Sequence, residues 1–222
     1  IDVDKGGLKY GARLDLLPLG KFKPGNDGYI ADLLHEDTIK ILTGAAYSFN
    51  NGASNRVGEG HGDFVFYDKD LKQKLPDYRK WYGDILIKYK GFSLLGEYVN
   101  SSALSLEGSY LNSTATIPLF MTEISNYLVL GNGYNIQSGY VTKSGFSLDF
   151  KYEKLTKEFT KTTSLLSNQD AMTIGITKYL KGNNLKIQSS VSTRNTEQFN
   201  TVLNANENVK TLTAQISFLV VF

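Results

Sequence analysis

"GFSLDFKYEKL", residues 145–155, contains the pattern that decides the fold of this chain. Phe146, Leu148, Phe150 and Tyr152 alternate with polar or charged residues at the positions between them. Because successive side chains of a β-strand point to opposite faces, this spacing predicts a strand with one apolar and one charged face. The segment is also as long as a tilted strand that crosses a bilayer, which needs about 9–11 residues.

The same alternation recurs along the chain. It predicts strands over residues 8–17, 39–49, 80–89, 91–100, 133–142, 145–155, 171–180, 185–194 and 212–222. The last of these alternates up to the final residue, whereas soluble domains commonly end in polar tails. With 14 Tyr, 12 Phe, 21 Gly and only 4 Pro, the composition also favours many strands joined by tight turns.

The connections between these strands alternate in length. Short turns are expected at 89–91, 142–145 and 180–184, and long polar loops at 50–79, 101–132, 156–170 and 195–208. Membrane β-barrels combine short periplasmic turns with long extracellular loops in this way. If Phe222 lies at the periplasmic rim, every short turn is periplasmic, and 18–38 is one long periplasmic connection. We therefore predict a single all-β domain over 1–222, a transmembrane antiparallel β-barrel with about nine strands, as against a soluble β-sandwich or lipocalin-like barrel.

Aromatic residues gather near the two ends of the predicted strands. Their rings combine an apolar body with a polar tip, which membrane interfaces favour. We predict membrane-interface positions at Tyr47, Phe49, Trp81, Tyr89, Phe92, Tyr98, Tyr134, Tyr140, Phe146, Tyr152, Phe218 and Phe222.

Charged residues occupy the opposite face of the predicted strands. A sheet can span hydrocarbon only if it closes, so this face would surround a lumen. We predict pore-lining positions at Lys9, Arg13, Asp15, Lys40, Asp84, Lys88, Glu97, Asp149, Lys151, Glu153, Lys186 and Arg194. The mixture of signs indicates at most a mild preference for anions.

An odd number of strands leaves two alternatives, because bacterial outer-membrane barrels usually have an even number. Either the chain is the C-terminal part of a larger barrel and is incomplete at its N-terminus, or residues 39–222 form a complete eight-stranded barrel. We favour the first, because residues 8–17 alternate as well as any later segment. In addition, a narrow filled lumen accepts charged residues only as a paired network.

Other function classes have little support. A net charge of +2 gives no field that would attract nucleic acid. The chain has no cysteine, and His35 and His61 both fall in connections, so we expect no catalytic triad, no enzyme activity, no cofactor and no metal site. The "HEDT" turn at 35–38 could hold a divalent cation together with Asp32, but a solvated acidic turn is expected there.

The connection 101–132 contains the stretch "TIPLFMTEISNYLVL", residues 116–130. This stretch is too apolar for an exposed loop. We expect it either to fold into the lumen as a constriction or to pack on a neighbouring protein.

Two stretches carry a family resemblance. "GARLDLLPLGKF" (11–22) and "ADLLHEDTIKILTGAAYSFN" (31–50) resemble the late barrel region of the phosphate-selective porin O and P family of Bacteroidetes-type bacteria. The matching residues are Arg13, Pro18, Gly20, Gly44, Ala45, Ala46, Tyr47 and Asn50.

The resemblance implies an integral protein of the bacterial outer membrane, surrounded by lipid and trimeric. It implies the C-terminal part of a 16-stranded porin, with about seven strands upstream, inserted by the outer-membrane assembly machinery through its last strand. The expected function is passive diffusion of small anionic or neutral solutes through a water-filled channel. The cationic cluster that gives the family its phosphate preference would lie outside this sequence. The alternative is a small structural or adhesive barrel over 39–222 without a conducting pore.

Overall fold

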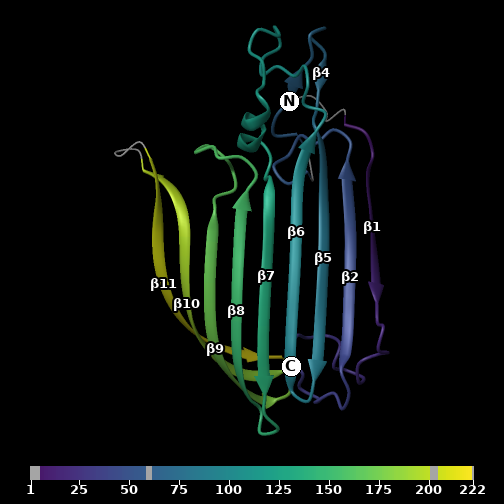
Figure 1. The fold of residues 1–222 in the computed structure, drawn as a ribbon, viewed down its shortest axis with the longest axis vertical. Helices are drawn as coiled ribbons and strands as arrows, with labels where there is room; N and C mark the ends of the chain where they lie inside the picture. The colour runs from purple at the N-terminus through teal and green to yellow at the C-terminus, as the bar shows by residue number, and fades with distance from the viewer. Residues whose placement is uncertain (1–5, 59–61, 201–204, 222) are drawn as a thin grey trace.

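The computed structural model describes residues 6–58, 62–200 and 205–221. One antiparallel sheet of nine strands dominates the fold, and each strand pairs with its neighbours in chain order (Figure 1). The strands are β1 (Lys9–Leu16), β2 (Lys40–Asn50), β5 (Asp77–Tyr89), β6 (Phe92–Leu104), β7 (Gly131–Val141), β8 (Phe146–Lys157), β9 (Gln169–Lys181), β10 (Leu185–Asn200) and β11 (Ala205–Val220). The expected all-β class is confirmed.

The connections add little regular structure. The strands β3 (Phe66–Tyr67) and β4 (Gln73–Lys74) form a separate small sheet in the predicted loop 50–79. A short 3-10 helix, η1 (Met121–Asn126), lies in the predicted loop 101–132. The sequence pattern predicted neither of them.

The expected closed barrel is not seen in the described residues. β1 and β11 form the two edges of the sheet, and no pairing joins them. Figure 1 shows β9, β10 and β11 bending at their lower ends, but this curvature carries the sheet only part of the way round. Both edges therefore keep a row of backbone N–H and C=O groups without a partner strand.

The short turns follow the prediction. The β5–β6 turn places Gly91 at a φ of 91°, and the β7–β8 turn places Gly145 at a φ of 81°. Only glycine adopts such angles without strain, so these positions fix tight hairpins. We call the end of the sheet with these turns and with segment 18–38 the turn end, and the opposite end the loop end.

The prediction of a loop over 195–208 is wrong for most of its length. β10 continues to Asn200 and β11 begins at Ala205, and the two stay paired up to these residues. Residues 201–204 lie outside the described part of the chain. Apart from Phe199 and Ala205 these strand ends are polar on both faces, so no apolar alternation marked them as strands.

The two faces of the sheet differ in chemistry. One face, here called the apolar face, carries large side chains that remain exposed, among them Leu148 (61%), Ile176 (57%) and Phe218 (73%). The register keeps them together across strands: Tyr140 lies opposite Leu148, which lies opposite Ile176. The other face, here called the polar face, carries the charged residues of the same strands. Nothing in the described structure covers the apolar face.

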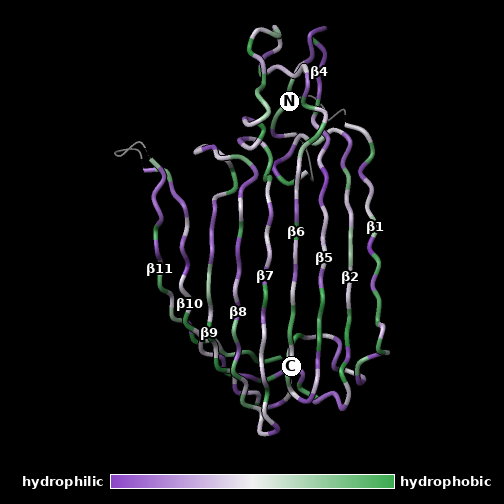
Figure 2. The backbone as a smooth tube through the Cα atoms, viewed as in Figure 1, coloured by the Kyte–Doolittle hydropathy of each residue, from purple (hydrophilic) through white to green (hydrophobic). Residues whose placement is uncertain are grey.

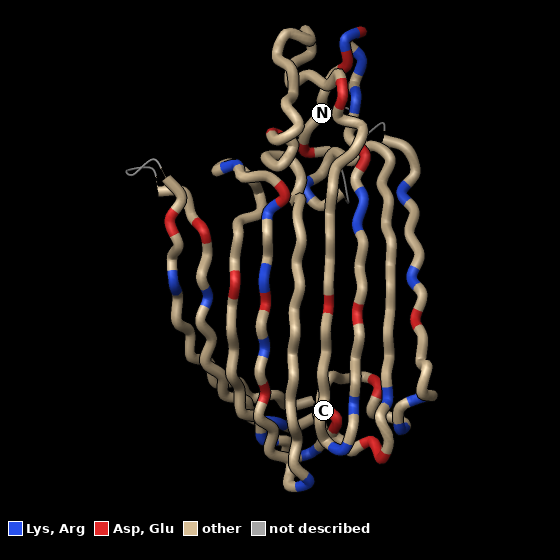
Figure 3. The backbone as a smooth tube through the Cα atoms, in the orientation of Figure 1, with Lys and Arg blue, Asp and Glu red and all other residues tan. Residues whose placement is uncertain are grey.

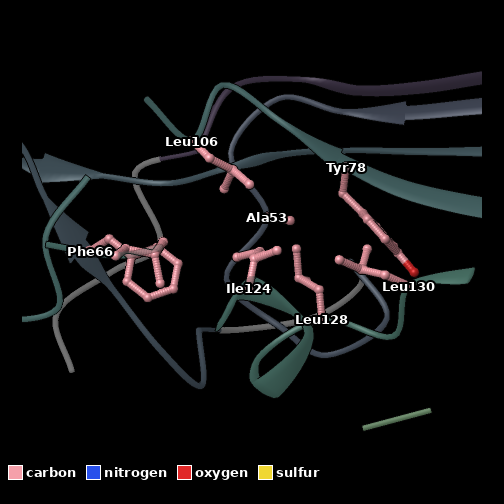
Figure 4. Close-up of a cluster of buried hydrophobic side chains, with 8 residues drawn as sticks. Ala53, Phe66, Tyr78, Leu106, Ile124, Leu128 and Leu130 are labelled. Atoms are coloured by element: carbon pink, nitrogen blue, oxygen red, sulfur yellow. The ribbon is translucent and has the colours of Figure 1, made fainter. Parts of the chain in front are cut away.

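A hydrophobic cluster lies at the loop end, where the segments 51–76 and 105–130 meet (Figure 4). The rings of Phe66 and Tyr127 pack edge to face with centroids 5.0 Å apart. We call this set the loop cluster; its buried members are Ala53, Phe66, Tyr78, Leu106, Leu119, Ile124, Leu128 and Leu130.

The loop cluster is tied to the polar face of the sheet. The carbonyl of Val129 accepts hydrogen bonds from the hydroxyls of Tyr78 on β5 (2.7 Å) and Ser101 on β6 (2.8 Å). Both donors lie on the same face of their strands as the charged residues. The end of segment 101–132 therefore lies against the polar face of its own sheet at the loop end, and its role as a constriction or as a contact to another protein stays a prediction.

Ile124 is fully buried in the loop cluster. We expect Ile124→Ala to lower the free energy of unfolding of the packed loops by about 2–4 kcal/mol, because the smaller side chain leaves a cavity that its neighbours do not fill. Limited proteolysis of the folded protein should then cleave within 105–130 faster than in the parent. Ile117→Ala is the matched control, since Ile117 is 52% exposed. Equal cleavage rates in the two variants would contradict the packing described here.

Candidate functional site

The polar face brings all the predicted pore-lining residues to one side of the sheet. Alternation and register place there Lys9, Arg13, Asp15, Lys40, Asp84, Lys88, Glu97, Asp149, Lys151, Glu153, Lys186 and Arg194. Figure 3 shows Lys and Arg interspersed with Asp and Glu along the strands, without a block of one sign. That these residues line a pore stays a prediction.

Arg13 is the most strongly paired of these residues. Its two terminal nitrogens donate to the two carboxylate oxygens of Asp84, at 2.8 and 2.9 Å, across the intervening strand β2. The same guanidinium contacts Asp15 at 2.7 Å. Bidentate pairs of this kind are the strongest geometry for arginine and carboxylate. The charge of Arg13 is thus offset within the sheet.

Gly44 makes this pairing possible, because it lies on β2 between Asp15 and Asp84 in the register. A Cβ atom at Gly44 would lie 2.3 Å from Nη2 of Arg13. Any side chain there would push the guanidinium away from Asp84.

We expect Gly44→Ala to break the bidentate contact and to lower the free energy of unfolding, because the added Cβ displaces the guanidinium from Asp84. Gly83→Ala is the control, because a Cβ at Gly83 meets nothing within 4 Å. Denaturant unfolding in detergent micelles measures both. A Gly44→Ala protein as stable as the Gly83→Ala protein would contradict the role assigned to Gly44.

The acidic residues near the middle of the polar face are held by neighbouring polar groups. Glu153 pairs with Lys151 at 2.7 Å. Asp149 accepts hydrogen bonds from the hydroxyls of Ser147 (2.8 Å) and Thr177 (3.1 Å). Glu97 accepts a hydrogen bond from the amide of Asn135. These contacts fix the carboxylates in place.

The remaining basic residues differ in how they are held. Lys40 donates to the carbonyl of Leu19 (2.9 Å), and Lys186 donates to the side chain of Asn183 (3.0 Å). Arg194 lies between Ala171 and Thr211 in the register, and Lys9 lies opposite Asn50. They are spread over the sheet and form no cationic cluster.

Lys88 does not face solvent, which corrects its prediction as an open wall residue. The side chain is completely buried beneath segment 18–38. Its ammonium donates to the backbone carbonyls of Asn26, Tyr29 (2.5 Å) and Ala31 (3.2 Å). It also lies 5.4 Å from the ring centroid of Phe22 and 5.2 Å from that of Tyr29, at cation–π distances. The alternation placed Lys88 on the correct face, but segment 18–38 covers that part of the face.

Segment 18–38 contains a second buried polar group. Asp32 accepts hydrogen bonds from the backbone amides of Glu36 (3.0 Å) and Gly91 (2.8 Å), and the amide of Asn26 bridges Asp32 and Glu36. Asp32, Glu36 and Asn26 are all buried. The expected solvated acidic turn is therefore wrong for these residues, whose carboxylates are satisfied by amides. Among the described residues there is no group of three Asp, Glu or His side chains that could hold a metal ion.

Two groups at the surface of this segment have shifted pKa values. Lys23 lies 2.9 Å from the carboxylate of Asp37, and this contact keeps the pKa of Asp37 below its usual value. Partial burial, together with the charge of Asp27, raises the pKa of Tyr29. Both effects belong to a segment that is fixed against the sheet.

A cavity of about 400 Å³ opens on the polar face near mid-sheet. It is lined by Arg13, Asp84, Glu97, Asn135, Glu153 and Gln169, among others. The oxygen of the Asn135 amide is buried there without a hydrogen-bond partner in the described structure. The side chains of this wall can form hydrogen bonds with small polar solutes of either charge, because they include carboxylates, carboxamides and one guanidinium paired with carboxylates.

The predicted interface aromatics lie on the apolar face in two bands. Near the loop end, the rings of Tyr47 and Trp81 are 4.4 Å apart, and those of Tyr134 and Tyr152 are 5.9 Å apart. Near the turn end, the register sets Tyr89, Phe92 and Tyr140 side by side on three strands. The members of the two bands that the structure describes are Tyr47, Phe49, Trp81, Tyr89, Phe92, Tyr98, Tyr134, Tyr140, Phe146, Tyr152 and Phe218. Phe222 lies outside the described residues.

Sequence reasoning missed an ion pair at the loop end. Lys157 and Glu197 lie 2.9 Å apart with side chains only 6% and 14% exposed. Both residues lie in segments predicted as loops. The sequence of a loop does not indicate which charged residue 40 positions away will pair with it.

Comparisons with known proteins gave no match to a family model, to a curated protein or to a solved structure. No helix in the described residues is long and apolar enough to cross a membrane.

Proposed function

We propose that this chain forms part of the wall of a bacterial outer-membrane β-barrel, and that the barrel is a porin through which small hydrophilic solutes diffuse passively. The observation that carries the proposal is that the same strands have one apolar face and one charged face. One face exposes large apolar side chains between two aromatic bands, and the other carries charges with hydrogen-bonded partners. A lipid environment on one side and water on the other favour this division.

The open edges fit this proposal, since a sheet in hydrocarbon must satisfy every backbone polar group. In the proposed porin, further strands pair with β1 and β11 and close the wall. A total of 16 strands, as the porin O and P resemblance implies, leaves a water-filled lumen. The proposed assembly is a homotrimer in outer-membrane lipid, inserted through β11 by the outer-membrane assembly machinery.

The described strands argue against an eight-stranded barrel of residues 39–222. Such a barrel needs β2 to pair with β11, but β2 pairs with β1 along the whole of Lys9–Leu16. β1 also shares the polar face through Arg13, which reaches Asp84 on β5. We therefore favour the larger channel over a small adhesive barrel.

The proposal does not extend to a preference for phosphate. Lys88 is buried, and Arg13 is neutralised by two carboxylates. The carboxylates of Asp84, Glu97 and Glu153 remain on the same face. We propose small neutral and ionic solutes as the cargo, with no anion selectivity from this part of the wall.

Single cysteines test the division of faces, because the chain has no cysteine of its own. Gln137 lies on the polar face opposite Lys151, and Ile136, its neighbour on β7, lies on the apolar face. In the full-length protein in its membrane, a charged membrane-impermeant thiosulfonate should label Gln137→Cys and lower the single-channel current. It should leave Ile136→Cys unlabelled.

Equal labelling of the two cysteines would contradict a lipid-facing apolar side. A protein that inserts and labels selectively, yet shows no stepwise conductance in a planar bilayer, would leave a membrane barrel but overturn the porin.

A further inference from the structure

A second cavity, of about 550 Å³, lies at the loop end of β8–β11 and shares Leu155 and Gln169 with the polar-face cavity described above. Its lining includes Lys154, Asp170, Asn195, Glu197, Asn206 and Asn208. These side chains alternate in phase with Tyr152, Met172 and Leu212, so they belong to the side of the sheet that is apolar further down. The volume falls in the range of small-molecule sites, about 300–1,000 Å³.

The cavity begins where the apolar surface ends. The last apolar row of the register runs from Tyr152 through Met172 and Thr193 to Leu212. The next row toward the loop end is fully polar and consists of Lys154, Asp170, Asn195 and Lys210. Figure 2 shows the same change to hydrophilic residues at the upper ends of β10 and β11. In a membrane, this row would lie at the level of the outer headgroups.

The acidic side chains of the cavity are already held. Glu197 accepts hydrogen bonds from Lys157 (2.9 Å), Asn168 (2.5 Å) and Asn206. Asp170 accepts one from the amide of Asn195 at 3.3 Å. The Lys157–Glu197 pair has no net charge, so it offers little repulsion to an anion.

Donors remain in and beside the cavity: Lys154 and Asn208 line it, and Lys210 lies next to it, opposite the lining residue Asn195. In the part of the chain that the structure describes, Lys154, Lys210 and Asn208 have no ion pair or hydrogen bond from their side chains. Ammonium groups bind phosphate as point charges, and carboxamides both donate to and accept from sugar hydroxyls. Two free ammonium groups beside a row of carboxamides therefore suit a phosphorylated sugar.

We propose that this cavity binds the phosphorylated sugar headgroup of a glycolipid in the outer leaflet, and that Lys154 and Lys210 contact its phosphates. The inference rests on the proposed function only for the placement of the sheet in an outer membrane. It concerns the lipid side of the wall and requires no conducting pore.

The test uses the full-length protein in detergent and native mass spectrometry with three probes: bis-phosphorylated lipid A, the same lipid without its phosphates, and phosphatidylglycerol. We expect the bis-phosphorylated lipid to bind at least tenfold more tightly than the other two. The double variant Lys154→Gln with Lys210→Gln should lose most of this preference. Lys151→Gln, on the opposite face of β8, is the control and should keep it.

Three results overturn the proposal: equal binding of phosphatidylglycerol, equal binding of the dephosphorylated lipid, or an unchanged preference in the double variant. A folded fraction, recognised by its heat-modifiable migration on gels, is required of every variant. As a second variant, Asn208→Leu keeps both lysines and removes only a carboxamide that contacts the sugar, so it should weaken binding about threefold. Conductance is measured on the same samples, so loss of the porin and loss of the lipid site are separate results.

Discussion

Val191→Arg should prevent stable insertion of the protein, with a loss of about 2–4 kcal/mol of folding free energy in a bilayer. Val191 lies near the middle of β10 on the apolar face, opposite Ile174 and Ala214. An arginine there would face hydrocarbon if the sheet is part of a membrane wall. Folding into lipid vesicles, followed by heat-modifiable migration on gels, measures the effect.

Ser190→Arg is the matched control, one residue away on the polar face. It should fold as well as the parent, because its neighbours there are Gly175 and Gln215. Val191 is 49% exposed in the structure, so a soluble sheet would tolerate both arginines. Equal folding of the two variants in vesicles would therefore count against the membrane assignment.

Lys88→Met should release segment 18–38 from the sheet. The substitution removes the donor from three backbone carbonyls and the nearest buried positive charge from Asp32 and Glu36. Buried groups that lose their partners become strongly destabilising, here by about 2–4 kcal/mol. Hydrogen exchange of the amides in 22–36 should become faster than in the parent, while the strands stay protected.

Lys40→Met supplies the comparison. Lys40 lies opposite Lys88 in the register and makes one hydrogen bond, to the carbonyl of Leu19. Its loss should cost less than about 1 kcal/mol, the value of an exposed contact. Unchanged exchange in the Lys88→Met protein would mean that other contacts hold the segment.

The strands and their faces could be predicted from the sequence because the two faces differ in polarity along the middle of each strand. β8 is the clearest case, since Phe146 to Tyr152 alternate without exception. Where polar residues occupy both faces, as from Asn195 to Gln198, the alternation disappears and the sequence predicted a loop. Two-residue alternation therefore identifies a strand only where the environments of its two faces differ in polarity.

The coverage of the polar face could not be predicted, because it depends on contacts between distant residues. Alternation assigns Lys88 a face, but Asn26, which covers it, lies 62 residues earlier in the chain. The apolar stretch 116–130 likewise showed only that it needed partners, and the structure supplies them from segment 51–76. Closure of the sheet is a third property of this kind, since it depends on how β1 and β11 find partners.

In the described residues, each strand of the large sheet forms backbone pairs only with the preceding and the following strand of that sheet. Such a sheet is modular in its backbone pairing, since one hairpin can be added or removed without changing the backbone pairs inside the others. The diameter of such walls grows with the number of strands. In the proposed barrel, duplication of single hairpins would therefore widen the lumen in small steps while the existing strands kept their pairing.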